Sequence, residues 1–345
     1  MTPQEWESPE TLAAPVHASV GQTAAYGLRP LSTGEVLDRT FEIYRAHFWL
    51  FAGLASLSGA FSLILNAIQM VVHHAVLLHY GIRIAGLVTQ GSSAVMGLLG
   101  LPVTAVVYAA SVYALCEVYL GRRTTAKESL NATIGRWLRY VGIALWQGWS
   151  AVWVGLLVVV PGIVLVSIGG KAIGVGMVVV AGFMVFAGFV AGGVYGVIAY
   201  IRNSLAIPAS VMEGTGVRAS MRRSKTLATD TKGKIFVVLL IAFALYLVVG
   251  TIESPMLFFI ARSPFKEHVM AQAAVLLIGF VGHTLVSPVA LIGLTLVYFD
   301  QRVRIEAFDL VMMLGGVAAP EVAAWAPVEG TSGEAVEPMG SDGHV

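Results

Sequence analysis

The feature that most constrains this chain is a series of uninterrupted apolar blocks, each about 25 to 30 residues long, which is long enough to cross a hydrocarbon core about 30 Å thick. Only helices and closed barrels span lipid, because backbone polar groups find no partner there. Barrel strands alternate apolar and polar residues, whereas these blocks are continuously apolar. The sequence therefore predicts an all-α, polytopic membrane protein.

Composition supports this class. The chain is 57% hydrophobic and 12% charged, whereas soluble domains carry about 25% charged residues. We expect six transmembrane helices in three hairpins, at 48–72, 95–120, 140–168, 172–200, 235–260 and 270–299. The first 47 residues contain no apolar run of signal-peptide length, so we expect the first span to direct insertion.

Segments at both ends differ from this membrane domain, which we place at 29–312. Residues 1–28 are polar and small, and 313–345 are of low complexity. Both segments predict disorder.

Basic residues gather on one side of the predicted spans. The side of the N-terminus carries 17 of them: Arg29, Arg39, Arg45, Arg122, Arg123, Lys127, Arg136, Arg139, Arg202, Arg218, Arg222, Arg223, Lys225, Lys232, Lys234, Arg302 and Arg304. The other side carries 4: Arg83, Lys171, Arg262 and Lys266. Since cytoplasmic loops are enriched in Lys and Arg, we expect both termini to be cytoplasmic.

Short amphipathic helices are predicted on that same side. Ser32 and Glu35 match a capping box at the start of the first one. Hydroxyl residues predicted to cap helices recur at Ser32, Thr124 and Thr215, about 91 residues apart, each before a short charged helix and an apolar hairpin. This spacing indicates a threefold internal repeat, although hairpins of one orientation also resemble each other without common descent.

Four segments carry a resemblance to a known family. They read LRPLSTGEVLDRTF at 28–41, VVVPGI at 158–163, PASVMEG continuing to ASMRRS over 208–224, and YFDQRVRIEAFDL at 298–310. In this order, over 28–312, the chain resembles the bacterial family named after the membrane domain of glycerophosphoryl diester phosphodiesterase. The resemblance implies a multi-span protein of the bacterial inner membrane. The His-Arg-Gly and Glu-Asn-type motifs of the phosphodiesterase barrel do not occur here, so it implies no catalytic residue.

Polar residues within the spans are candidates for a functional site, because they are costly in lipid. Asn66, Gln69, Glu253 and His283 fall in the predicted outer half of the bilayer, and we expect Glu253 and His283 to pair. The alternative places Glu253 in water at the outer interface. Glu117 lies near the cytoplasmic surface, where we expect it to pair with Arg122 or to reach solvent.

Two further patterns have specific interpretations. A basic segment is predicted to contact anionic lipid through Arg218, Arg222, Arg223 and Lys225, unless these residues only fix the topology. A row of small residues, Gly188, Gly192 and Gly196, predicts close helix packing. Adjacent histidines at His73 and His74, with His79, do not make a convincing metal site, because no Cys or acidic ligand lies nearby.

We therefore expect a non-enzymatic membrane module without cofactor: a scaffold, accessory or lipid-interacting protein. Its expected partners are the bilayer, anionic phospholipids and a protein at the cytoplasmic face, with no nucleic acid. A small transporter or lipid-handling permease that uses the outer polar residues is an alternative. A membrane anchor for a separate phosphodiesterase is another.

Overall fold

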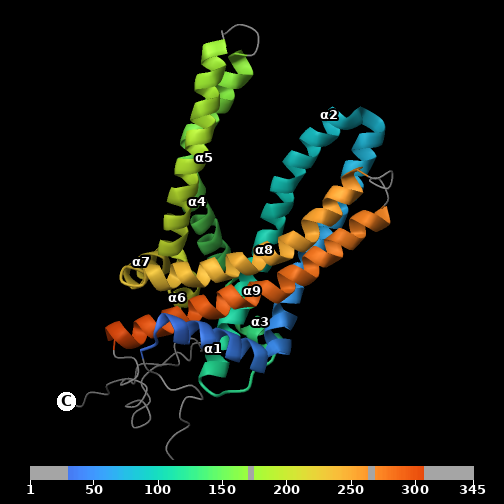
Figure 1. The fold of residues 1–345 in the computed structure, drawn as a ribbon. Coiled ribbons are helices and arrows are strands. Elements are labelled where there is room, and N and C mark those ends of the chain that lie inside the picture. Colours follow the sequence, from blue (N-terminus) through green and yellow to red (C-terminus); the bar gives the residue numbers. More distant parts are fainter. Residues whose placement is uncertain (1–29, 170–174, 263–268, 307–345) are drawn as a thin grey trace, which may run out of the picture.

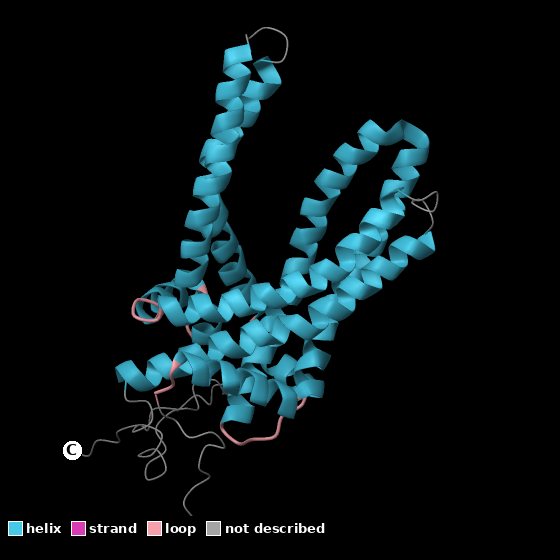
Figure 2. Cartoon of the chain, in the orientation of Figure 1, coloured by secondary structure: helices cyan, strands magenta, loops and turns pink. Residues whose placement is uncertain are grey.

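The computed structural model describes residues 30–169, 175–262 and 269–306. Within these ranges the chain is all-α, with no strand (Figure 2). Its helices are α1 (Thr33–Ala46), α2 (Phe48–Tyr119), α3 (Ala126–Ile134), α4 (Trp137–Gly169), α5 (Val175–Asn203), α6 (Ala206–Glu213), α7 (Val217–Leu227), α8 (Lys232–Arg262) and α9 (Val269–Glu306). The expected arm at 1–28 and tail at 313–345 lie outside the described residues.

Six segments of the described chain are long and apolar enough to cross a membrane, as the sequence predicts. They are Phe48–Gly81, Val88–Tyr119, Trp137–Leu165, Gly176–Glu213, Lys232–Met256 and Ala273–Glu306. The first two belong to α2, which turns back on itself at Gly81 (φ 77°, ψ 174°). A positive φ of this kind suits glycine, which has no Cβ to clash with the backbone. The loop predicted between 72 and 95 was therefore too long, because the first hairpin turns mainly at this glycine.

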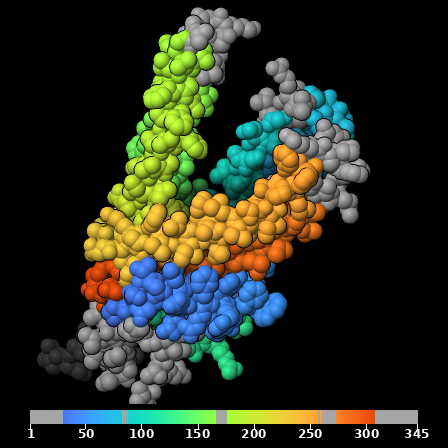
Figure 3. Space-filling model, viewed as in Figure 1, coloured from blue at the N-terminus to red at the C-terminus, as the bar shows by residue number. Residues whose placement is uncertain are grey.

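The helices form a base and two arms (Figure 1). We define the base as α1, α3, α6 and α7 with the adjoining ends of the long helices. One arm is the α4–α5 hairpin, and the other combines α2 with the α8–α9 hairpin, where α9 packs against both α2 and α8. Figure 3 shows the two arms diverging above the base, with open space between them.

Burial differs sharply between these parts. The largest enclosed side chains include Ile43, Leu115, Leu205, Leu227 and Tyr298, all in or next to the base. The α4–α5 arm instead exposes Trp149 by 66%, Phe183 by 69% and Phe189 by 78%. Contiguous apolar surface of this kind marks contact with a membrane or a partner. The described part of the molecule therefore has a close-packed core, like that of a soluble protein, only in the base.

The three short helices α1, α3 and α7 are built alike, which supports the internal repeat. Ser32 and Thr125 cap α1 and α3, each in a capping box with the glutamate three residues on, and Gly216 precedes α7. The positions four and eight residues after these caps are almost fully buried in all three helices: Val36, Ser129 and Ser220, then Thr40, Thr133 and Ser224. Small hydroxyl residues tolerate such burial when they donate to the carbonyl one turn back.

The cap at Ser32 confirms the prediction, whereas the other two predicted caps are wrong by one residue. Thr124 and Thr215 lie just before the caps, and each hydroxyl instead bonds a serine five residues on, Ser129 or Ser220. At α3 two adjacent threonines compete for the cap, and the sequence does not rank them, whereas at α7 the cap is Gly216, which supplies no side-chain hydrogen bond.

The glycine row brings α4 and α5 into backbone contact. A Cβ added to Gly192 would lie 2.4 Å from the Cα of Gly155, and one added to Gly196 would lie 2.9 Å from the carbonyl oxygen of Ala151. At Gly188 it would lie 2.9 Å from the Cβ of Val158. The α4 side of this contact, Gly155 and Ala151, was not anticipated. The row therefore holds the exposed arm together by close approach of two helix backbones.

We predict that Gly192→Ala lowers the thermal stability of the purified protein in mild detergent, because its Cβ would force α4 away from α5. The matched control is Gly193→Ala on the next residue, where an added Cβ meets no atom within 4 Å. This control should be neutral or stabilising, since alanine favours helix over glycine by about 1 kcal/mol. Equal melting temperatures for the two variants would contradict the packing.

Candidate functional site

A fully enclosed carboxylate, that of Asp300 near the end of α9, organises the base. Its Oδ2 lies 2.6 Å from the Nζ of Lys234, and its Oδ1 lies 2.9 Å from the Nε of Arg304. The backbone N–H of Leu31 also donates to this carboxylate, at 2.7 Å. A buried charge with this many partners is compensated.

The two cations also hold the chain just before α1. Both Lys234 and Arg304 donate to the carbonyl oxygen of Leu31, at 2.6 and 2.9 Å. Leu31 itself is 3% exposed. One residue from each of α8 and α9 thereby fixes the start of α1, although these segments are far apart in sequence.

A second ionic cluster joins α6, α7 and α9. Arg223 pairs with Glu213 at 2.9 Å and with Glu306, and Arg302 pairs with Glu306 at 2.9 Å. The hydroxyl of Tyr298 donates to Glu213 at 2.9 Å. Arg223 is therefore bound within the protein, which corrects our expectation that it contacts lipid together with its neighbours.

The remaining cations of α7 have a different environment. Arg218, Arg222 and Lys225 lie at helical spacing on one exposed face, and no ion pair within the described residues involves them. The opposite face buries Ser220, Met221, Ser224 and Leu227. We call Arg218, Arg222 and Lys225 the α7 basic face.

One predicted ion pair near the base is present. The guanidinium of Arg122 lies 3.7 Å from the carboxylate of Glu117. Arg122 is more than half exposed, so this contact contributes at most about 1 kcal/mol.

The expected outer polar site is divided between separate places. In α2, Gln69 donates to the Oγ of Ser93 at 2.6 Å, and Asn66 donates to the carbonyl oxygen of Ser62 at 2.8 Å. These residues line one cavity of about 490 Å³ between the two halves of α2. His73 contacts Thr89 at 2.6 Å just above it, and the described residues contain no cluster of three metal-ligating side chains.

Glu253 and His283 share the interface of α8 and α9, but they do not pair. The Nδ1 of His283 lies 3.4 Å from the hydroxyl of Tyr246. The carboxylate of Glu253 lies over Gly279, where an added Cβ would be 3.3 Å from Oε1. Our predicted pair was therefore wrong, because matched depth along two helices does not determine where the side chains point. His283 instead contacts the hydroxyl of Tyr246.

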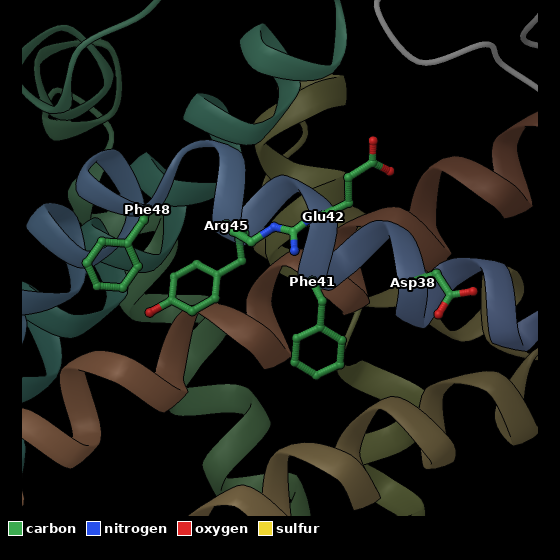
Figure 4. A pocket seen from close by; sticks show the side chains of 6 residues that line it. Asp38, Phe41, Glu42, Arg45 and Phe48 are labelled. Carbon is green, nitrogen blue, oxygen red and sulfur yellow. The ribbon is translucent and has the colours of Figure 1, made fainter.

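A second cavity lies beside α1. It measures about 620 Å³ and is lined by Asp38, Phe41, Glu42, Tyr44, Arg45 and Phe48. Figure 4 shows Phe41 and Phe48 pointing to one side of the chain and Glu42 to the other. Phe41 is 44% exposed and the nearby Trp49 is 85% exposed. Such aromatic side chains are typical of a membrane–water interface.

We predict that Asp300→Asn destabilises the protein by about 3 kcal/mol, because Lys234 and Arg304 would lose their buried counter-charge. Asp38→Asn removes the same charge from an exposed position of α1, and should have little effect. Thermal unfolding of both variants in one detergent measures the difference. Equal stability of the two variants would show that the Asp300 cluster does not hold the base together.

No protein-family model, curated protein or solved structure matches this chain. The functional inference therefore rests on the base, the α7 basic face and the cavity in α2.

Proposed function

We propose that this chain is a non-enzymatic, lipid-interacting module of the bacterial inner membrane, with its base and both termini in the cytoplasm. The orientation is supported by the distribution of basic residues, 17 against 4 across the predicted spans. The resemblance noted in the sequence supports the same membrane. In this account the base attaches to the inner leaflet, and the arms cross the bilayer.

The observation that supports this proposal most directly is that only one of the four cations of α7 is paired within the part of the protein that the structure describes. Arg223 forms ion pairs with Glu213 and Glu306, whereas the α7 basic face has no acidic partner among the described residues. The membrane-crossing segments on either side, Gly176–Glu213 and Lys232–Met256, end close to α7 in sequence. The basic face therefore lies where helices leave the hydrocarbon, within reach of lipid phosphates.

The strength of this contact follows from the charge. Each Lys or Arg near an anionic leaflet contributes about 1 kcal/mol. Three such cations give about 3 kcal/mol, which corresponds to an affinity ratio on the order of 100. Because the buried face of α7 is fixed in the base, the three side chains are presented together.

A transporter that uses the outer polar residues has less support. It depended on a shared site of Glu253 and His283, and these side chains have separate contacts. An accessory role for a cytoplasmic protein partner is compatible with a base that lies in the cytoplasm.

We predict that the triple variant Arg218→Gln, Arg222→Gln, Lys225→Gln binds phosphatidylglycerol on the order of 100-fold more weakly than the wild type, because three headgroup contacts are lost. Native mass spectrometry of the detergent-solubilised chain, titrated with this lipid, gives the affinity. The charge-conserving double variant Arg218→Lys, Arg222→Lys should bind as the wild type does. Unchanged affinity of the triple variant would contradict the proposal.

A further inference from the structure

The cavity within α2 is a groove between the first two membrane-crossing segments. Five of its lining side chains are polar: Ser62, Asn66, Gln69, Ser93 and Thr104. Gly97 and Gly100 also line it, together with Leu65, Met96 and Leu101. The lining contains no charged residue. The groove therefore offers neutral polar groups between two segments that are apolar enough to cross a membrane.

Its polar groups are not equally satisfied. Gln69 donates both to Ser93 Oγ and to the carbonyl oxygen of Thr89. Asn66 is exposed, and it makes a single hydrogen bond, from Nδ2 to the carbonyl of Ser62. Its Oδ1 and its second N–H have no partner among the described residues. Asn66 therefore presents one donor and one acceptor to whatever fills the groove.

The depth of Asn66 makes this exposure costly. It lies 18 residues beyond Phe48, or about 27 Å along the helix. Since the hydrocarbon core is about 30 Å thick, this position is in the half of the bilayer far from the base. This depth is just inside the far edge of the hydrocarbon, where water is scarce and an unsatisfied amide is unfavourable. An occupant that supplies hydrogen-bonding groups at this depth is therefore favoured.

Size and surroundings identify that occupant. A volume of about 490 Å³ suits a small molecule, whereas a neighbouring helix is about 10 Å across and extends over the whole bilayer. Apolar side chains also line the groove: Leu65, Met96 and Leu101. A phospholipid has both parts that such a site requires, ester carbonyls and acyl chains.

We propose that the groove binds the glycerol-ester region of one phospholipid from the leaflet far from the base. Asn66 Nδ2 donates to an ester carbonyl, and the acyl chains lie along the apolar lining side chains Leu65, Met96 and Leu101. This site is separate from the α7 basic face, and depends on the proposed function only for which leaflet supplies the lipid.

The test uses two glycines of the same helix. A Cβ added to Gly97 or to Gly91 meets no atom within 4 Å, so both positions accept a larger residue. Gly97 lines the groove and Gly91 does not. Gly97→Leu should fill the groove and abolish retention of phosphatidylcholine, which is zwitterionic and does not probe the basic face. Gly91→Leu should retain it, and Asn66→Leu should weaken it about tenfold.

Native mass spectrometry of the full chain with phosphatidylcholine counts the retained lipids and reveals oligomers. The proposal requires one lipid per wild-type chain that is lost in Gly97→Leu only. It is overturned if the wild type retains none, or if Gly97→Leu retains as many as Gly91→Leu. It is also overturned if Gly97→Leu dissociates a dimer and leaves the lipid count unchanged, because a second copy would then cover the groove.

Discussion

The enclosed carboxylate of Asp300 is the interaction on which the base depends. It joins α8 through Lys234, α9 through Arg304 and the start of α1 through the N–H of Leu31. Lys234 and Arg304 also donate to the carbonyl oxygen of Leu31, so that the polar groups at this junction satisfy one another. The cluster around Arg223 and Glu213 extends the same principle to α6 and α7. Through α6 and α7, the diverging α4–α5 arm is thereby tied to α9 at the base.

The helices of the arms are held together by a different kind of interaction from those of the base. The α4–α5 arm is held by glycine contacts between two backbones, at Gly192 and Gly155, rather than by a buried apolar core. Its large side chains, such as Phe189, face outward. In lipid, burial of apolar groups does not drive helices together, and close packing of small residues takes its place. The base is thus stabilised by a buried core, as water-soluble proteins are, whereas the α4–α5 arm depends on the close packing typical of membrane helices.

The sequence predicts well what depends on local pattern. Apolar length specifies the six segments, and the hydroxyl–glutamate spacing specifies the cap at Ser32. It predicts poorly what depends on contacts between distant residues. Lys234 and Asp300 are 66 residues apart, and nothing local indicates that they meet, although an acidic residue directly after an apolar span is a usable signal. Gly81 was missed because the hairpin turn lies within helix-forming sequence, and Glu253 and His283 failed to pair because depth does not determine side-chain direction.

The central claim is that the charged base lies in the cytoplasm, while the tips of the arms reach the other side. The most direct measurement is cysteine labelling in intact cells with a membrane-impermeant reagent, in a Cys116→Ser background that removes the single cysteine of the chain. Tyr80, 67% exposed and next to the turn at Gly81, marks the tip. Thr229, exposed after α7, marks the base. The account predicts that Tyr80→Cys is labelled in intact cells and Thr229→Cys only after permeabilisation. Labelling of Thr229→Cys in intact cells would contradict it.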